Sequence, residues 1–252
     1  MAEAVVYRDF YFPLNAFLHI LSHEEGAARY LHYGLFEREN EPILHAQERS
    51  TAMLLERLPP PPARILDVGV GLGTTVATLR RLGYDAEGIT PDEEQIVAVE
   101  QRYGDQVVVA CAAFEGFTGR APYDAVLFQE SSQYIDSDAL FNAAAAITRH
   151  VIVLDEFAVG RVDPSGALHD FDGFLEAAAS HGFRKIEEID VSKMAAPTID
   201  YYMQRIPRYR DSLITQLGLT AEMLDDLVER GHRYRELYAN GTYVYRLLQF
   251  KR

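Results

Sequence analysis

Short apolar runs alternate with amphipathic stretches over most of the chain. Runs rich in β-branched and aromatic residues occur at 64–68, 86–89, 106–111, 123–128, 150–154 and 184–189. Apolar residues at helical spacing occur at 74–82, 92–103, 137–148 and 170–181. This alternation is typical of a parallel sheet with crossover helices, and 242–251 predicts one more strand. We therefore expect an α/β fold of the Rossmann-like, doubly wound class.

The segments before the first predicted strand and before the last one do not follow this alternation. A helix predicted over 41–58 stops at the four prolines 59–62, because proline lacks an amide donor and clashes with the preceding turn. We expect a helical cover at 1–58 and one main domain at 59–252. Within that domain, residues 191–240 are rich in tyrosine and charge and lie just before the last strand. A long insertion at this place predicts a lid over a substrate pocket.

Composition and charge exclude several classes of protein. Lys and Arg number 24 against 38 Asp and Glu, a net charge of −14 that would repel a nucleic acid. The apolar runs are far shorter than the roughly 20 residues that cross a bilayer, so no membrane span is expected. The single cysteine, Cys111, excludes an intrachain disulfide. The start of the chain has no secretory pattern, which favours a cytoplasmic location.

One glycine-rich turn carries the main functional signal. A predicted strand ends at Asp67, and Gly69, Gly71 and Gly73 follow before a predicted helix. Glycines let the backbone approach a ligand closely, and the helix start presents free amides to it. A dinucleotide fingerprint needs glycine at the sixth position from Gly69, where this chain has Thr74. The pattern D-x-G-x-G-x-G therefore argues against a nicotinamide cofactor.

This turn resembles that of the class I S-adenosylmethionine (SAM) dependent methyltransferases, over about residues 30–190 and the last strand. The resemblance is to the small-molecule branch, which includes sarcosine, tocopherol and sugar methyltransferases and the cyclopropane synthases. It implies a seven-stranded sheet with SAM over the glycine turn, at the carboxyl ends of the strands.

The resemblance also implies further cofactor contacts. Thr90 and Gln95 stand where many members of the family have a ribose-binding acid, and both can donate and accept hydrogen bonds. A plain helix start capped by Asp92 is the other interpretation, and the two are compatible. Phe114 and Glu115 resemble an adenine-binding stretch, although an aromatic residue beside an acid is also common in loops.

Two more segments resemble the family. His32-Tyr33-Gly34 is similar to a segment before the SAM domain in which an aromatic ring covers the methionine end of SAM, so Tyr33 is a candidate for that role; packing of an aromatic helix end is the alternative. Gln129, at the end of the fourth strand, is placed beside the cofactor.

The candidate catalytic residues follow the fourth and fifth strands. Related methyltransferases have a histidine base where this chain has Gln133 and Tyr134, which favours proton transfer assisted by Tyr134 or Glu130, or catalysis by proximity alone. Glu130 could instead hold SAM or cap a helix. Asp155 and Glu156 end the fifth strand, and only one of them can face the cleft because neighbouring strand residues point to opposite faces. Glu156 or Asp155 is therefore the candidate orienting group or general base.

No metal is expected, since His19 and His23 share helical spacing without an accompanying acid. The sequence thus predicts SAM-dependent methyl transfer to an oxygen or nitrogen of a small molecule, such as a secondary metabolite or a sugar. The alternatives are C-methylation of an isoprenoid or lipid, and a SAM-binding partner subunit without catalysis. The expected partner is the small-molecule acceptor, and a homodimer is left open.

Overall fold

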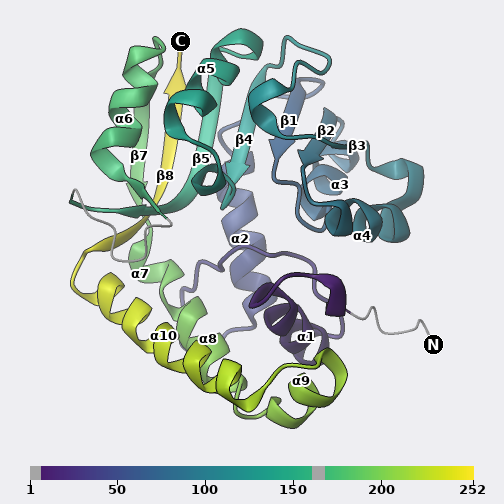
Figure 1. Cartoon of the computed structure of the whole chain (residues 1–252). Helices are drawn as coiled ribbons and strands as arrows, with labels where there is room; N and C mark the ends of the chain where they lie inside the picture. Colours follow the sequence, from purple (N-terminus) through teal and green to yellow (C-terminus); the bar gives the residue numbers. More distant parts are fainter. Residues whose placement is uncertain (1–6, 161–167) are drawn as a thin grey trace.

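The computed structural model describes residues 7–160 and 168–252, which form one mixed sheet with helices on both faces (Figure 1). Seven strands follow the order β3-β2-β1-β4-β5-β8-β7, and the two-residue strand β6 (His169–Asp170) pairs with β5 beside this path. The seven are β1 (Arg64–Val68), β2 (Asp85–Thr90), β3 (Val109–Cys111), β4 (Ala125–Gln129), β5 (His150–Ala158), β7 (Arg184–Asp190) and β8 (Tyr243–Lys251). The predicted α/β fold is confirmed.

The sheet lies between two hydrophobic layers. Successive strand residues point to opposite faces, so Ile65 packs in the same cluster as Leu54 and Leu79, whereas Leu66 packs with Phe141 and Phe174. The first layer therefore includes α2 (Ile43–Leu55) and α3 (Thr74–Arg81), and the second α5 (Ser137–Ile147) and α6 (Phe171–Ser180). The helix α4 (Glu93–Tyr103) follows β2.

The strands depart from the predicted ranges at three places. β3 is shorter than 106–111 because Gly104–Gln106 form a 3-10 turn. β5 extends to Ala158 because both β8 and β6 pair with its last residues. The last strand is antiparallel to β5 and β7, so the sheet is mixed rather than wholly parallel.

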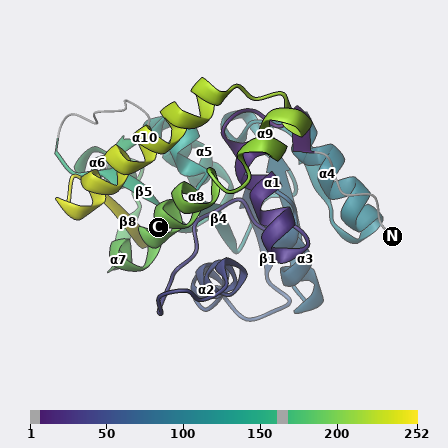
Figure 2. The same ribbon diagram turned by 90° about the horizontal axis from the view of Figure 1, so that it is seen from below.

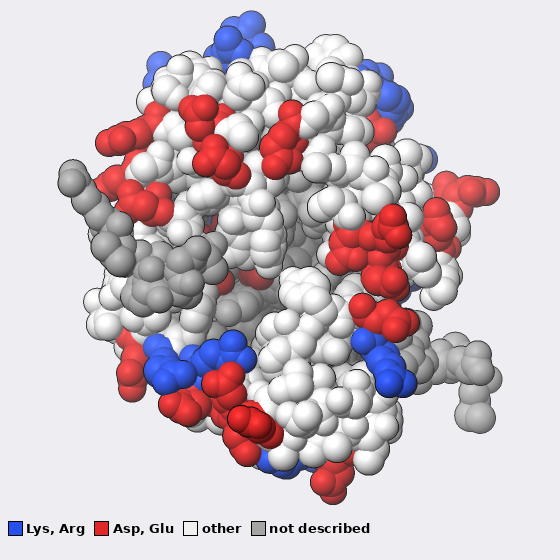
Figure 3. All heavy atoms as spheres, in the orientation of Figure 1, with Lys and Arg blue, Asp and Glu red and all other residues white. Residues whose placement is uncertain are grey.

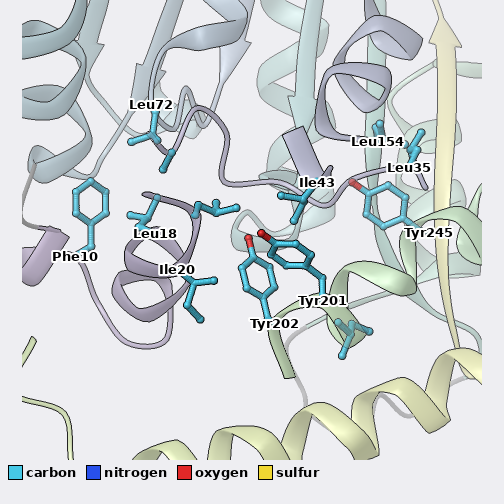
Figure 4. Close-up of a cluster of buried hydrophobic side chains, with 14 of the residues drawn as sticks. Phe10, Leu18, Ile20, Leu35, Ile43, Leu72, Leu154, Tyr201, Tyr202 and Tyr245 are labelled. Atoms are coloured by element: carbon cyan, nitrogen blue, oxygen red, sulfur yellow. The ribbon is translucent and has the colours of Figure 1, made fainter. Parts of the chain in front are cut away.

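A layer of helices lies below the carboxyl ends of the parallel strands (Figures 1 and 2). It comprises η1 (Tyr7–Asp9), α1 (Leu14–Glu25), α7 (Ser192–Ala195), α8 (Pro197–Arg205), α9 (Arg210–Leu217) and α10 (Ala221–Ala239). Figure 4 shows Leu18 and Ile20 of α1 in one cluster with Tyr201 and Tyr202 of α8 and Ile43 of α2, and all five are buried. Segments from both ends of the chain thus meet at this edge of the sheet.

None of the helices in residues 7–160 and 168–252 combines the length and the apolar character that crossing a bilayer requires. The domain limits and the lid role of 191–240 stay predictions.

Candidate functional site

A cavity of about 650 Å³ lies between the carboxyl edge of the sheet and the helical layer. Its walls come from the ends of β1, β2, β4 and β5, from the segment 31–33, and from α1 and α8. β1 and β4 are neighbours in the sheet although two strands separate them in sequence, which is the switch point where ligands bind in such sheets. Figure 3 shows this face hollowed in the middle, with acidic atoms visible inside the hollow.

The glycine turn forms one wall of this cavity. Gly69 and Gly71 line it, with φ angles of +77° and +54° that favour glycine. A Cβ on Gly69 would stand 2.4 Å from the Cβ of Ser131. Gly73 lies behind the wall, where a Cβ would meet the Val99 side chain at 3.0 Å. The first two glycines therefore expose backbone to the cavity, and the third lets α3 and α4 approach closely.

Asp67 is a buried carboxyl beside this turn. Its side chain is 3% exposed, and no described residue forms a hydrogen bond with it. Burial raises its pKa to about 7. Asp67 is not among the residues that line the cavity, so its contact with a bound ligand stays a prediction.

Thr90 and Gln95 lie together on the adjacent wall. The Thr90 hydroxyl donates to Oε1 of Gln95 over 3.0 Å, and both residues line the cavity. Asp92 caps α4, accepting from the amides of Glu94 and Gln95, and its Oδ2 accepts from Nε2 of Gln95 at 3.1 Å. The helix start and the polar pair predicted as alternatives therefore coexist.

Phe114 and Glu115 also line the cavity, but they differ in burial. The Phe114 ring is 2% exposed and packs edge-on against Phe128, with 5.1 Å between ring centroids, whereas Glu115 is exposed. Phe114 is therefore a core residue that contributes only part of its surface to the cavity.

Gln129 and Tyr33 are held by a network from α2. The Gln129 amide donates to Oγ of Ser50 at 3.1 Å. Burial lowers the pKa of His32 to about 4, so its ring is neutral near pH 7. Its Nδ1 donates to the Tyr33 carbonyl at 2.9 Å, and its Nε2 accepts from Thr51 at 3.1 Å. This network fixes the backbone of the 31–33 segment against the cavity.

Glu130 and Glu156 face the cavity from the ends of β4 and β5. Oε1 of Glu130 accepts from the Tyr33 amide and from the Tyr245 hydroxyl, each at 2.6 Å. Burial and then the neighbouring Glu156 raise the pKa of Glu130 well above its usual range. The Glu130 backbone has a φ of +53°, which is uncommon for a residue with a side chain and is typical of functional turns.

Glu156 is 5% exposed and is bonded by two phenols of α10. Tyr238 donates to its Oε1, and Tyr234 donates to its Oε2 at 3.1 Å. Burial raises the pKa of Glu156 to about 7, although both phenols oppose the shift. Glu130 and Glu156 thus meet on the wall of one cavity, which the third candidate, Tyr134, also lines.

Asp155 and Tyr134 have different positions. Asp155 is fully buried and accepts from the backbone amide and the hydroxyl of Ser132 at 2.9 and 2.6 Å, so Glu156 is the residue that faces the cleft. Tyr134 lines the cavity at its rim and is 71% exposed. Its hydroxyl lies 3.5 Å from that of Tyr11, and no recorded bond joins it to either glutamate.

The sequence patterns did not point to Tyr245, and Tyr234 and Tyr238 entered only as unnamed members of the tyrosine-rich segment 191–240. Tyr245 lies opposite Glu156 in the β5–β8 register. The alternation of Tyr243 and Tyr245 places both on one face of a strand, which is a signal of a common role. These tyrosines can be connected with Glu130 and Glu156 only when β8 is known to run antiparallel beside β5.

No metal centre is formed in the part of the chain that the structure describes: no three His, Cys, Asp or Glu residues are grouped to hold an ion. His19 bonds to Oγ of Ser212 at 2.9 Å, and the ring of His23 bonds to the carbonyl of His19. Both histidines therefore have structural partners.

Comparison with solved structures identifies the fold. The cyclopropane synthase MmaA2 from Mycobacterium tuberculosis has a TM-score of 0.81 at 16% identity, covering 99% of this chain and 98% of that one. The chain has the methyltransferase fold. A geranyl diphosphate C-methyltransferase from Streptomyces coelicolor A3(2) gives 0.70 at 17% identity, over 99% and 96% of the two chains. The [4+2]-cyclase SpnF, with 0.77 at 17% identity over 93% and 92%, shares the methyltransferase fold as well. No protein-family model and no curated protein matches the sequence.

Proposed function

We propose that this chain binds SAM and transfers its methyl group to a small molecule. One observation carries the proposal: the exposed backbone of Gly69 and Gly71, the Thr90–Gln95 pair and the carboxyls of Glu130 and Glu156 share a single cavity. In such a cavity the cofactor and the acceptor can be brought into line, which supplies much of the rate enhancement of a group transfer. The similar C-methyltransferase was solved with S-adenosylhomocysteine (SAH), the product of SAM.

The residues of the cavity fit SAM chemically. SAM carries a net positive charge, and the described wall residues include four acids. Thr90 and Gln95 offer the donor and acceptor that a ribose diol needs, and Asp67 has an unfilled acceptor beside the glycine turn. Tyr33 would cover the methionine end, Gln129 would lie near the methyl group, and Phe114 and Glu115 would lie on the adenine side. When bound, SAM supplies an electrophilic methyl group on a sulfonium.

The protein's own residues would orient the acceptor and move its proton. Glu130 and Glu156 sit at the ends of neighbouring strands with raised pKa values, as is typical of groups that exchange protons near neutral pH. The helices of 191–240 provide Tyr234 and Tyr238 and would act as a lid, excluding water from the reacting methyl group.

O- or N-methylation stays the first proposal, and C-methylation is the second, because aromatic faces and carboxylates also stabilise the cation formed when an alkene is methylated. A diphosphate acceptor is disfavoured. The geranyl diphosphate C-methyltransferase was solved with Mg²⁺ and a thiolodiphosphate, whereas the cavity wall described here has neither a metal cluster nor a lysine or arginine.

A binding subunit without catalysis is a separate proposal, and SpnF shows that the fold occurs with another named reaction. The net charge of −14 supports a partner other than nucleic acid. Cytoplasmic location and a homodimer stay predictions.

Calorimetric titration with SAH tests the cofactor. We expect micromolar binding, on the order of 8 kcal/mol, and its loss in Gly71→Arg, because an arginine there would fill the cavity wall against Leu31. NAD is the control ligand. Binding of NAD instead of SAH would overturn the proposal. Methyl transfer from labelled SAM to a metabolite extract then separates an enzyme from a binding subunit.

A further inference from the structure

The charge of the cavity wall restricts the acceptor, provided that the proposed function holds. The ionisable wall residues of the described chain are Asp92, Glu115, Glu130, Glu156, His32 and four tyrosines, with no lysine or arginine among them. His32 is neutral near pH 7 because burial lowers its pKa to about 4. An anionic acceptor would therefore find no positive side chain on the described wall to offset its charge, which is strongly unfavourable in a low-dielectric space.

The two glutamates leave one acceptor atom for a ligand. Both hydrogen bonds to Glu130 end on Oε1, from the Tyr33 amide and the Tyr245 hydroxyl. Each oxygen of Glu156 receives one phenol, from Tyr238 or Tyr234. Among the described residues, none donates to Oε2 of Glu130, although Glu130 lines the cavity. A ligand with a hydrogen-bond donor could bind to this oxygen of Glu130.

Aromatic rings surround the carboxyls. Tyr33 and Tyr245 are parallel, with centroids 5.9 Å apart, and Tyr202 stacks on Phe17 at 4.2 Å. Tyr33, Phe17 and Tyr202 line the cavity together with Leu14 and Ile135. Ring faces attract cations, and the aliphatic side chains accept an apolar body.

We propose that the methyl acceptor is an amine with an apolar body, whose nitrogen binds at Oε2 of Glu130 within this ring of tyrosines. The amine enters as an ammonium ion, and its charge stabilises the ionised form of the glutamate pair. A proton passes from nitrogen to the Glu130 carboxylate. The freed lone pair then forms the N–C bond to the methyl group, the C–S bond electrons stay on sulfur, and the products are SAH and a methylated ammonium ion.

Titration of the SAH-loaded protein with three matched probes tests this assignment. The probes are 2-phenylethylamine, 2-phenylethanol and 3-phenylpropanoate, which share an apolar body and differ in the charge of the head group. We expect the amine to bind at least tenfold more tightly than the alcohol, and the carboxylate not to bind. Equal binding of the alcohol or the carboxylate, or no amine binding up to about 10 mM, would overturn the inference.

Variants distinguish this inference from the cofactor proposal. Glu130→Gln should lower the amine affinity at least tenfold and leave the SAH affinity within about threefold. The matched control is Glu236→Gln, an exposed glutamate of α10, which should change neither. If the unmodified protein does not bind SAH, the proposed function is wrong. If it binds SAH and Glu130→Gln leaves the amine affinity unchanged, only the acceptor assignment is wrong. Circular dichroism checks that each variant folds.

Discussion

The hydroxyl of Tyr245 donates a hydrogen bond of 2.6 Å to the carboxyl of Glu130, 115 positions away in the chain. The phenol holds Oε1, and no described residue donates to Oε2. Tyr245→Phe removes this donor while keeping the ring. Hydrogen bonds to charged groups contribute about 1.5–3 kcal/mol, so we expect kcat/KM for methyl transfer to fall roughly 10- to 100-fold. SAH affinity should stay within about threefold in calorimetry. An equal loss of SAH binding would show that Tyr245 only supports the cavity.

The rate should depend on pH through Glu156. Its pKa is raised to about 7 by burial, so below that pH it is neutral and cannot help Glu130 to offset the charge of the ammonium acceptor. The groups around it are Asp155, Glu130, Tyr33, Tyr234 and Tyr238. We expect kcat/KM to rise with pH through about 7 and then level off. Tyr238→Phe removes a hydrogen bond that lowers this pKa, so the inflection should move to higher pH. An unmoved inflection would assign the titration to another group.

The free energy of unfolding should also depend on pH through Glu156, but it should fall with rising pH where the rate rises. A carboxyl whose pKa is raised in the folded state stabilises the fold below its unfolded pKa near 4.5, and this stabilisation is lost as pH rises through about 7. Between pH 5 and pH 8, the free energy of unfolding should therefore fall by about 1–3 kcal/mol less in Glu156→Gln than in the unmodified protein. Urea unfolding at several pH values measures it. Parallel curves for the two proteins would contradict the raised pKa.

Gln95 should contribute to cofactor affinity rather than to folding. Gln95→Ala removes the amide that pairs with Thr90, and one hydrogen bond is worth about 1 kcal/mol, so we expect SAH binding to weaken roughly five- to tenfold. The control is Glu94→Ala on the same helix turn, because Glu94 is exposed and absent from the cavity wall. If both variants weaken SAH binding alike, the effect comes from the helix start.

Tyr134 should act at the mouth of the cavity. Its exposed ring and its 3.5 Å contact with the Tyr11 hydroxyl connect the turn after β4 to the segment before α1. We expect Tyr134→Phe to keep kcat within about threefold and Tyr134→Ala to raise the acceptor KM, because only the second variant opens the mouth. A loss of kcat above tenfold in Tyr134→Phe would restore the proton-transfer role that the sequence suggested.

Local patterns were sufficient for the sheet and for the positions of the cavity wall. The glycine turn and Glu130 follow strands, Thr90 ends β2, and Glu156 lies two residues before the end of β5. The ends of neighbouring strands in a parallel sheet meet at one edge. The antiparallel direction of β8 could not be read locally, since a strand's own residues do not encode its neighbours. For the same reason the phenol of Tyr245 was not connected to Glu130.

Burial was also hidden from the sequence. The sequence predicts Phe114 as an aromatic residue in a loop, yet its ring packs against Phe128. Gln129 reads as a free amide at a strand end, yet it is bonded to Ser50 on α2. Both outcomes depend on tertiary packing between segments tens of residues apart, which spacing alone does not specify.

The insertion of β8 between β5 and β7 makes assembly of the sheet a late event in synthesis. Until residues 243–251 have been made, β5 and β7 each lack their shared neighbour, and their amides and carbonyls form open edges. Pairing between strands so distant in sequence is slow, because the connecting chain must first close. A ribosome-bound intermediate that ends before Tyr243 would therefore expose two unpaired strand edges, and it would lack the Tyr245 contact to Glu130. The same nine residues of β8 would thus cover the edges that chaperones must otherwise protect and complete the site.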